Sequence, residues 1–166
     1  TEHFMSDIHG EYEAFRHILH SGSGVVRKKI DEKLGNTISL AERNRLATLI
    51  YYPEEKLALI KQDCDNLIDW YRITIYRLVE VCRYIASKYT RSRVRKSTPE
   101  DFAYIIDELL NNPKDGDNKA DYYSEIVNSI ITTDVADEVI TALCQLISRL
   151  CIDRLHIVGD IFDRGP

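Results

Sequence analysis

The sequence ends with Leu155-His156-Ile157-Val158-Gly159-Asp160-Ile161-Phe162-Asp163-Arg164-Gly165-Pro166. Its apolar first part predicts a β-strand over 154–159, and the residues that follow supply two carboxylates and an arginine. Near the other end, Phe4-Met5-Ser6-Asp7-Ile8-His9-Gly10 shows the same pattern, with a predicted strand over 3–5 followed by a carboxylate and an imidazole. Because the carboxyl ends of parallel strands meet at one edge of a sheet, we expect both sets of side chains to form one site.

Almost everything between these two stretches predicts helix. Apolar residues at helical spacing indicate helices over 11–20, 25–34, 40–51, 54–89, 99–111, 119–131 and 135–153, with a break in the fourth near Asp63-Cys64-Asp65. The second half of 54–89 has apolar residues around most of its circumference, which predicts that it is the central helix of the region. The residues of its apolar stripe are Leu67, Tyr71, Leu78, Cys82 and Ile85, widened by Ile68, Ile75 and Val79.

Local signals fix several helix ends. The pattern of a capping box occurs at Ser39-Leu40-Ala41-Glu42, and Pro53 is suited to the first turn of a helix. Two further N-caps are predicted, at Thr98 before Pro99 and at Asp134 before the last helix. We therefore expect an α/β fragment dominated by α structure, with three parts. Residues 1–24 would be the first strand and helix of a core, 25–153 a helical insertion, and 154–166 a second core strand with a metal and phosphate loop.

Composition narrows the class of protein. The 166 residues are 44% hydrophobic and 30% charged, as in a soluble globular protein, and the net charge of −5 argues against a nucleic-acid partner. No apolar run approaches the about 20 residues that cross a bilayer, and no secretory signal is visible, so we expect no membrane partner. The four cysteines form no CxxC pair, which indicates small buried side chains in a reducing compartment.

The polar side chains at the two strand ends have metal-site chemistry. Asp7 and His9 are two positions apart, so in an extended chain both would lie on one face. A carboxylate and an imidazole suit Mn²⁺, Fe or Zn²⁺ better than Ca²⁺. A carboxylate at Asp160 can bridge two metal ions, and the planar guanidinium of Arg164 matches a phosphate. The plainer alternative is a pair of solvated turns.

Together, Asp7-Ile8-His9-Gly10 and Gly159-Asp160-Ile161-Phe162-Asp163-Arg164-Gly165 resemble the first two motifs of the calcineurin-like metallophosphoesterases. That resemblance implies two metal ions and hydrolysis of a phosphate ester by a metal-activated water. It implies that Asp7 and His9 hold the first metal and that Asp160 bridges both. It also implies that Asp163 orients a catalytic histidine and that Arg164 holds the substrate phosphate.

The long helical stretch between these two motifs limits the resemblance to one group within the superfamily. The chain resembles the class 3 fructose-1,6-bisphosphatases over essentially its whole length, at 6–12, 22–24, 49–53, 87–92 and 156–160. This implies a cytoplasmic, gluconeogenic, manganese-dependent hydrolase that takes the C1 phosphate from fructose 1,6-bisphosphate and leaves fructose 6-phosphate. The chain contains no Asn-His pair, so the superfamily's third motif is absent. We therefore expect these residues alone to be inactive and to need the remainder of the polypeptide.

Other interpretations of the sequence stay open. The two motifs also fit another metallophosphoesterase, such as a phosphoprotein or dinucleotide phosphatase, and the helices also fit a non-catalytic assembly module or a homo-oligomer interface. A basic run beginning near Lys88 contains Arg91, Arg93, Arg95 and Lys96. It predicts an anion site for the sugar's distal phosphate or an effector, against the alternative of a solvated helix end or partner contact.

Overall fold

The computed structural model describes the backbone of residues 24–111 and 117–163, with side chains for 24–111 and 121–152. In chain order the elements are α2 (Val25–Leu34), α3 (Leu40–Tyr51), α4 (Pro53–Asp63), α5 (Leu67–Ala86), α6 (Arg91–Ser97), the 3₁₀ helix η2 (Glu100–Phe102), α7 (Ala103–Asn111), α8 (Asp117–Thr132) and α9 (Ala136–Asp163). No strand occurs in these described ranges. The predicted dominance of helix is therefore confirmed. The predicted strand over 3–5 and helix over 11–20 lie outside the described residues.

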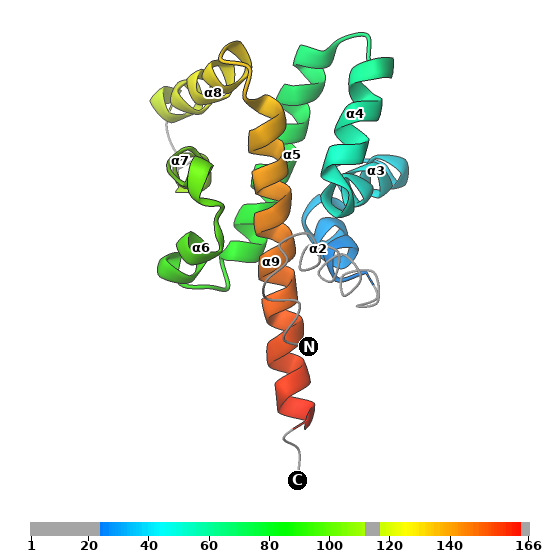
Figure 1. Cartoon of the computed structure of the whole chain (residues 1–166), viewed down its shortest axis with the longest axis vertical. Helices are drawn as coiled ribbons and strands as arrows, with labels where there is room; N and C mark the ends of the chain where they lie inside the picture. The colour runs from blue at the N-terminus through cyan, green and yellow to red at the C-terminus, as the bar shows by residue number, and fades with distance from the viewer. Residues whose placement is uncertain (1–23, 112–116, 164–166) are drawn as a thin grey trace, which may run out of the picture.

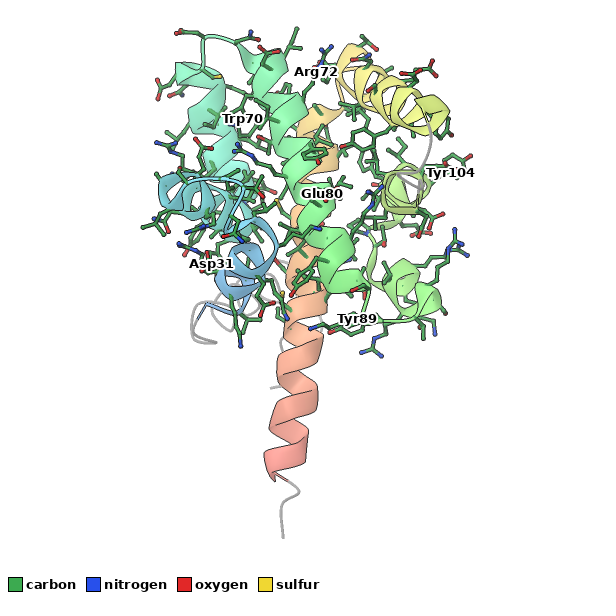
Figure 2. The ribbon with its side chains drawn as sticks, turned by 180° about the vertical axis from the view of Figure 1, so that it is seen from behind. Asp31, Trp70, Arg72, Glu80, Tyr89 and Tyr104 are labelled. Atoms are coloured by element: carbon green, nitrogen blue, oxygen red, sulfur yellow. The ribbon has the colours of Figure 1, made fainter. Side chains whose placement is uncertain are left out.

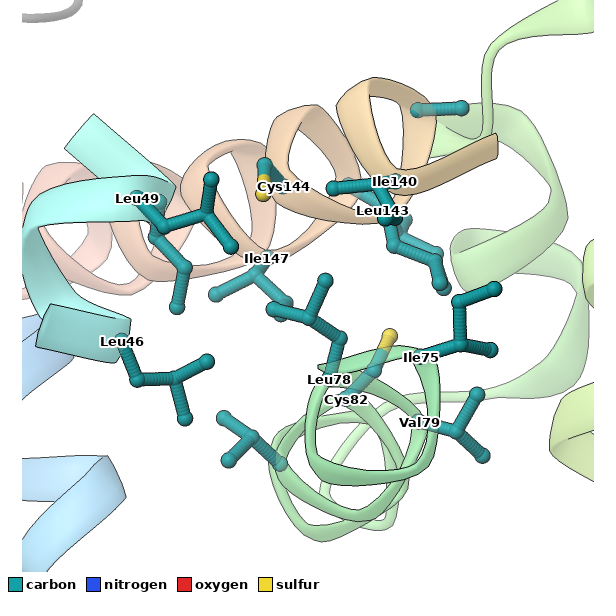
Figure 3. Packing of buried hydrophobic residues seen from close by; sticks show 14 of the residues in the cluster. Leu46, Leu49, Ile75, Leu78, Val79, Cys82, Ile140, Leu143, Cys144 and Ile147 are labelled. Atoms are coloured by element: carbon teal, nitrogen blue, oxygen red, sulfur yellow. The ribbon is translucent and has the colours of Figure 1, made fainter. Parts of the chain in front are cut away.

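The helices surround a central pair, α5 and α9, which run side by side (Figure 1). On one flank α2, α3 and α4 pack against this pair, and on the other flank lie α6, α7 and α8. Side chains from both central helices fill the space between them, with Leu78 and Ile147 pointing toward each other (Figure 3). The end of α9 extends beyond the other helices (Figure 1).

The helix ends in the first half follow the local signals. The Ser39 hydroxyl accepts a hydrogen bond from the Glu42 amide at 3.2 Å, so Ser39 is the N-cap of α3 as predicted. Pro53 occupies the first turn of α4, and the predicted break is confirmed because α4 ends at Asp63 and α5 begins at Leu67. These signals act through backbone groups within a few residues, so tertiary packing does not change them.

The apolar stripe of α5 was predicted correctly only in its second half. Ile75, Leu78, Val79, Cys82 and Ile85 are buried, whereas Ile68 is 52% exposed and Val81, outside the predicted stripe, is fully buried. The reason is the packing of α2 as well as α9 against α5, which encloses that helix on several sides.

Two polar residues are also buried in α5, Thr74 and Glu80. Glu80 is accommodated because its carboxylate lies 3.6 Å from Lys33 Nζ and 3.5 Å from Arg83 Nη1. A buried carboxylate with two cationic partners retains most of the favourable interactions that it would make with water.

Two predicted N-caps have other roles. The Thr98 hydroxyl donates to the Val94 carbonyl at 2.7 Å, so Thr98 ends α6 and Pro99 precedes η2 instead. Asp134 has a left-handed backbone with φ 62°. Its amide donates to the Ile131 carbonyl, and the next amide donates to the Ile130 carbonyl. This is a Schellman arrangement, so Asp134 closes the C-terminus of α8, and α9 begins two residues later.

The strand predicted over 154–159 is wrong for this structure, because α9 continues as a helix through Asp163. Helix elongation satisfies one more backbone hydrogen bond for each residue added, whereas a strand needs a neighbour. No strand is available to pair with it in the described ranges. Gly159 does not stop the helix, because a glycine inside a helix costs only about 1 kcal/mol relative to alanine.

Candidate functional site

The residues of the predicted metal site lie at the margins of the described structure. Asp7, His9 and Arg164 fall outside the described residues, and the structure describes the backbone of Asp160 and Asp163, in the last turns of α9, without their side chains. Within the described side chains, no group of three or more His, Cys, Asp or Glu residues is arranged to hold a metal ion. The meeting of Asp7, His9 and Asp160 at a metal therefore stays a prediction.

A second candidate site has complete geometry. The C-terminal part of α5, the short helix α6 and the helix α7 enclose a pocket of about 210 Å³. Thr90 starts α6 by accepting a hydrogen bond from the Arg93 amide at 3.2 Å. Within α6, Arg91 and Arg95 are one turn apart and both line the pocket, with Val94 between them.

Arg83 of α5 forms part of the pocket wall. Its Nε donates to the Leu110 carbonyl at 2.8 Å and its Nη2 donates to the Leu109 carbonyl at 2.7 Å. These contacts satisfy carbonyls at the C-terminal end of α7, where a cation is favoured by the helix dipole. Arg83 thereby ties α5 to α7, and its side chain is held in one orientation at the pocket.

The other charges of the pocket leave it cationic. Arg91 Nη2 lies 3.4 Å from an oxygen of Asp107, the one carboxylate among the lining residues. No described carboxylate lies within ion-pair distance of Arg95. Arg83 Nη1 lies 3.5 Å from Glu80, which is not a lining residue, so Arg95 is the lining guanidinium with no described carboxylate within ion-pair distance. Ser87 and Asn111 add neutral hydrogen-bonding groups. This arrangement can bind a small anion such as a phosphate.

Only part of the basic run that was predicted to bind an anion lines this pocket. Arg91 and Arg95 line the pocket, whereas Arg93 and Lys96, at other positions of α6, are not among its lining residues. Arg83 and Asn111 were missed in the sequence analysis. Arg83 lies on α5 and Arg91 on α6, so no helical spacing in the sequence links them, and Asn111 reaches the pocket only through the packing of α7.

The buried cysteines confirm the interpretation as small core side chains. Cys82, Cys144 and Cys151 are buried, and no disulfide joins any of the four cysteines, all of which lie in the described part of the chain. Burial raises the pKa of the Cys82 thiol to about 12 and also raises the pKa of Cys144. Both thiols therefore stay protonated at neutral pH, which makes them poor nucleophiles and metal ligands.

Comparison with known proteins identifies the class. A match to the family described as Firmicute fructose-1,6-bisphosphatase spans residues 1–166, so the chain belongs to that family. Among curated relatives, proteins named fructose-1,6-bisphosphatase class 3 are 58% identical in Clostridium acetobutylicum and 59% identical in Clostridium novyi, and one named fructose-1,6-bisphosphatase class 3 1 is 57% identical in Clostridium beijerinckii.

Each of these alignments covers all 166 residues of the chain but 25% of the relative. The chain therefore spans a quarter of the length of the curated relatives that it matches. No solved structure matches it. In the described part of the chain, no helix is both long enough and apolar enough to traverse a bilayer.

Proposed function

We propose that this chain is part of a metal-dependent fructose-1,6-bisphosphatase that removes the C1 phosphate of fructose 1,6-bisphosphate and leaves fructose 6-phosphate. The single observation that carries the proposal is the family match over residues 1–166, which includes both motifs with carboxylate and imidazole side chains. The proposed setting is gluconeogenesis in the cytoplasm, with the sugar bisphosphate as substrate.

The donor set of the motifs fits the implied metal. Asp7, His9 and Asp160 offer carboxylate oxygen and imidazole nitrogen, which suit Mn²⁺. In the proposal, Asp7, His9 and Asp160 would hold the metal ions, Asp163 would orient a catalytic histidine from elsewhere in the polypeptide, and Arg164 would bind the phosphate being transferred. When bound, the two ions would supply an activated water and shield charge on the phosphate.

The proposed division of the chain keeps its boundaries at 24/25 and 153/154. Residues 1–24 and 154–166 would contribute the metal-binding and phosphate-binding side chains of a site that the remainder of the polypeptide completes. Residues 25–153 would be a helical insertion that holds the arginine pocket. The boundary at 153/154 lies within α9, so it separates the helical insertion from the proposed metal and phosphate loop without a change in secondary structure.

Activity of the complete protein is the first test. Phosphate release from fructose 1,6-bisphosphate should require Mn²⁺ and should fall at least about a thousandfold in Asp7→Ala and Asp160→Asn, since two-metal chemistry needs its bridging ligands. Asp65→Asn is the matched control, because Asp65 is an exposed carboxylate between α4 and α5. Residues 1–166 alone should release no phosphate. Full activity of either ligand variant would refute the proposed site.

The same preparation separates the alternatives. Faster turnover of a phosphopeptide or a dinucleoside polyphosphate than of the sugar bisphosphate would favour another metallophosphoesterase. Isothermal titration calorimetry with Mn²⁺ tests the alternative that the protein is a non-catalytic module. A protein that binds no Mn²⁺ and hydrolyses none of the three substrates would be a helical assembly module.

We also propose that the pocket of Arg83, Arg91 and Arg95 binds a phosphate-bearing anion, either the distal phosphate of the substrate or an effector. Arg91→Gln with Arg95→Gln should weaken binding of a bisphosphate to the complete protein on the order of tenfold or more, since each charge-assisted contact contributes over 1 kcal/mol. Arg45→Gln is the control, because this exposed arginine lies on α3. Unchanged binding of the bisphosphate in the double variant, together with an unchanged response to phosphorylated metabolites, would refute the proposed anion site.

The two sources of the phosphate give different kinetics. If the pocket holds the distal phosphate of the substrate, the double variant should raise KM for the bisphosphate. If it holds an effector, KM should stay the same and the response to added phosphorylated metabolites should be lost.

A further inference from the structure

A shallow groove lies between α7 and α8, away from the arginine pocket. Its volume is about 280 Å³ and its floor is apolar, with Ile105, Ile126 and Ile130 among the lining residues. Tyr104 and Tyr122 stand at the groove and are 77% and 44% exposed. Two exposed tyrosines over an apolar floor are the composition of a protein-binding surface.

The groove is also acidic. Glu108 of α7 and Glu125 of α8 line it, and the Tyr122 hydroxyl donates to the Glu108 carboxylate at 3.2 Å. No lysine or arginine is among its lining residues. A partner that fills this groove should therefore bring both an apolar contact and positive charge.

The outer part of α6 has the complementary charge. Arg93 and Lys96 are exposed, are one turn apart and do not line the arginine pocket. The helix carries four cations and no carboxylate, and none of its residues is fully buried. α6 is thus a short basic ridge whose two sets of cations point in different directions.

The ridge and the groove belong to the same flank of the molecule. Figure 1 shows α6, α7 and α8 stacked in order along that flank, and Figure 2 shows Tyr104 at its outer edge. A basic patch next to an acidic patch on one face is self-complementary under a two-fold rotation, because each patch then meets the opposite patch of the partner.

We propose that this flank is a homodimer interface, in which the α6 ridge of each copy lies against the tyrosine-lined acidic groove of the other. A second copy is favoured over an unrelated partner because the chain itself supplies both halves of the charge complementarity. The inference is independent of the proposed phosphatase activity, since it uses none of the metal-site residues and leaves Arg91 and Arg95 in their pocket.

Reversing the charge of the ridge or of the groove tests the proposed interface, and mixing the two variants should restore association. The ridge variant is Arg93→Glu with Lys96→Glu, and the groove variant is Glu108→Lys with Glu125→Lys. Sedimentation equilibrium of the complete protein should show self-association on the order of tenfold weaker, or more, in each variant, since each places like charges opposite one another. An equimolar mixture of the two should associate again, because both of its contacts are then complementary.

A further variant tests the contribution of Tyr104 to self-association. Tyr104→Ser should also weaken association without a change in circular dichroism, because this side chain is mostly exposed in the single chain. A wild-type protein that is monomeric would overturn the proposal, as would unchanged association in the variants. Weakened association without rescue in the mixture would also overturn it, and would assign the flank to contacts with the remainder of the polypeptide.

Discussion

Replacing Leu78 with alanine tests whether the α5–α9 contact stabilises the fold. Leu78 is fully buried and points into the space between the two central helices (Figure 3). Truncation of a buried leucine removes about 2–3 kcal/mol of transfer free energy and leaves a cavity with a further cost, so we expect a loss of about 3–4 kcal/mol. With an m-value of about 2 kcal/mol/M in urea, the unfolding midpoint should fall by roughly 1.5–2 M.

The single tryptophan of the chain provides the signal. Trp70 is half-buried, and its ring lies 5.8 Å from the ring of Tyr71 in an edge arrangement, so its fluorescence should change when the helices separate. Urea titration of the 166-residue chain, followed by this fluorescence and by far-UV circular dichroism, gives both midpoints.

Leu59→Ala is the matched control for this prediction. Leu59 is 50% exposed on α4, so its truncation removes less buried surface and leaves no closed cavity. We expect a loss of less than about 1 kcal/mol. Equal midpoints for the Leu78 and Leu59 variants would show that the α5–α9 interface is not the stabilising core.

Three further predictions concern local features. Ser39→Ala should lower the free energy of unfolding by about 1 kcal/mol through loss of the α3 cap, whereas Ser92→Ala on exposed α6 should change it by less than about 0.5 kcal/mol; equal urea midpoints would contradict the cap. Glu80→Ala should cost about 1–3 kcal/mol in thermal or urea unfolding, because two cations lose a buried partner, and a neutral effect would contradict that role. Burial raises the pKa of Cys82 to about 12, above the roughly 8.5 of an unfolded thiol, so the folded protein keeps a proton that the unfolded chain loses. This contribution to stability is complete below about pH 8 and is lost as the pH rises toward 12, so Cys82→Ala should show a shallower alkaline loss of stability, and equal slopes would argue against it.

Part of the candidate site could be predicted from the sequence. The basic run that begins before α6 indicated an anion site, and Arg91 and Arg95 do line a pocket. The sequence could not separate these two from Arg93 and Lys96, because the face of a short helix that becomes enclosed depends on which helices pack beside it. The metal ligands are predicted from the motifs alone, and the place where they would meet lies outside the described side chains.

The sequence by itself determined where most helices begin and end. Ser39 and Pro53 act on backbone groups within their own turn, so their effect does not depend on the rest of the fold. Apolar spacing likewise determined that Leu78 and Cys82 would be buried, because one face of α5 had to meet another element.

Only the tertiary structure decided the roles that depend on two elements at once. Asp134 had the chemistry of an N-cap for α9 but closes α8, since the path of the chain between the two helices fixes its backbone in the left-handed region. The stretch from 154 had the composition of a strand but continues α9, since in the described part of the chain no neighbouring strand offers its backbone hydrogen bonds. In both places the local sequence allows two solutions, and the backbone hydrogen bonds that the folded chain makes available select one.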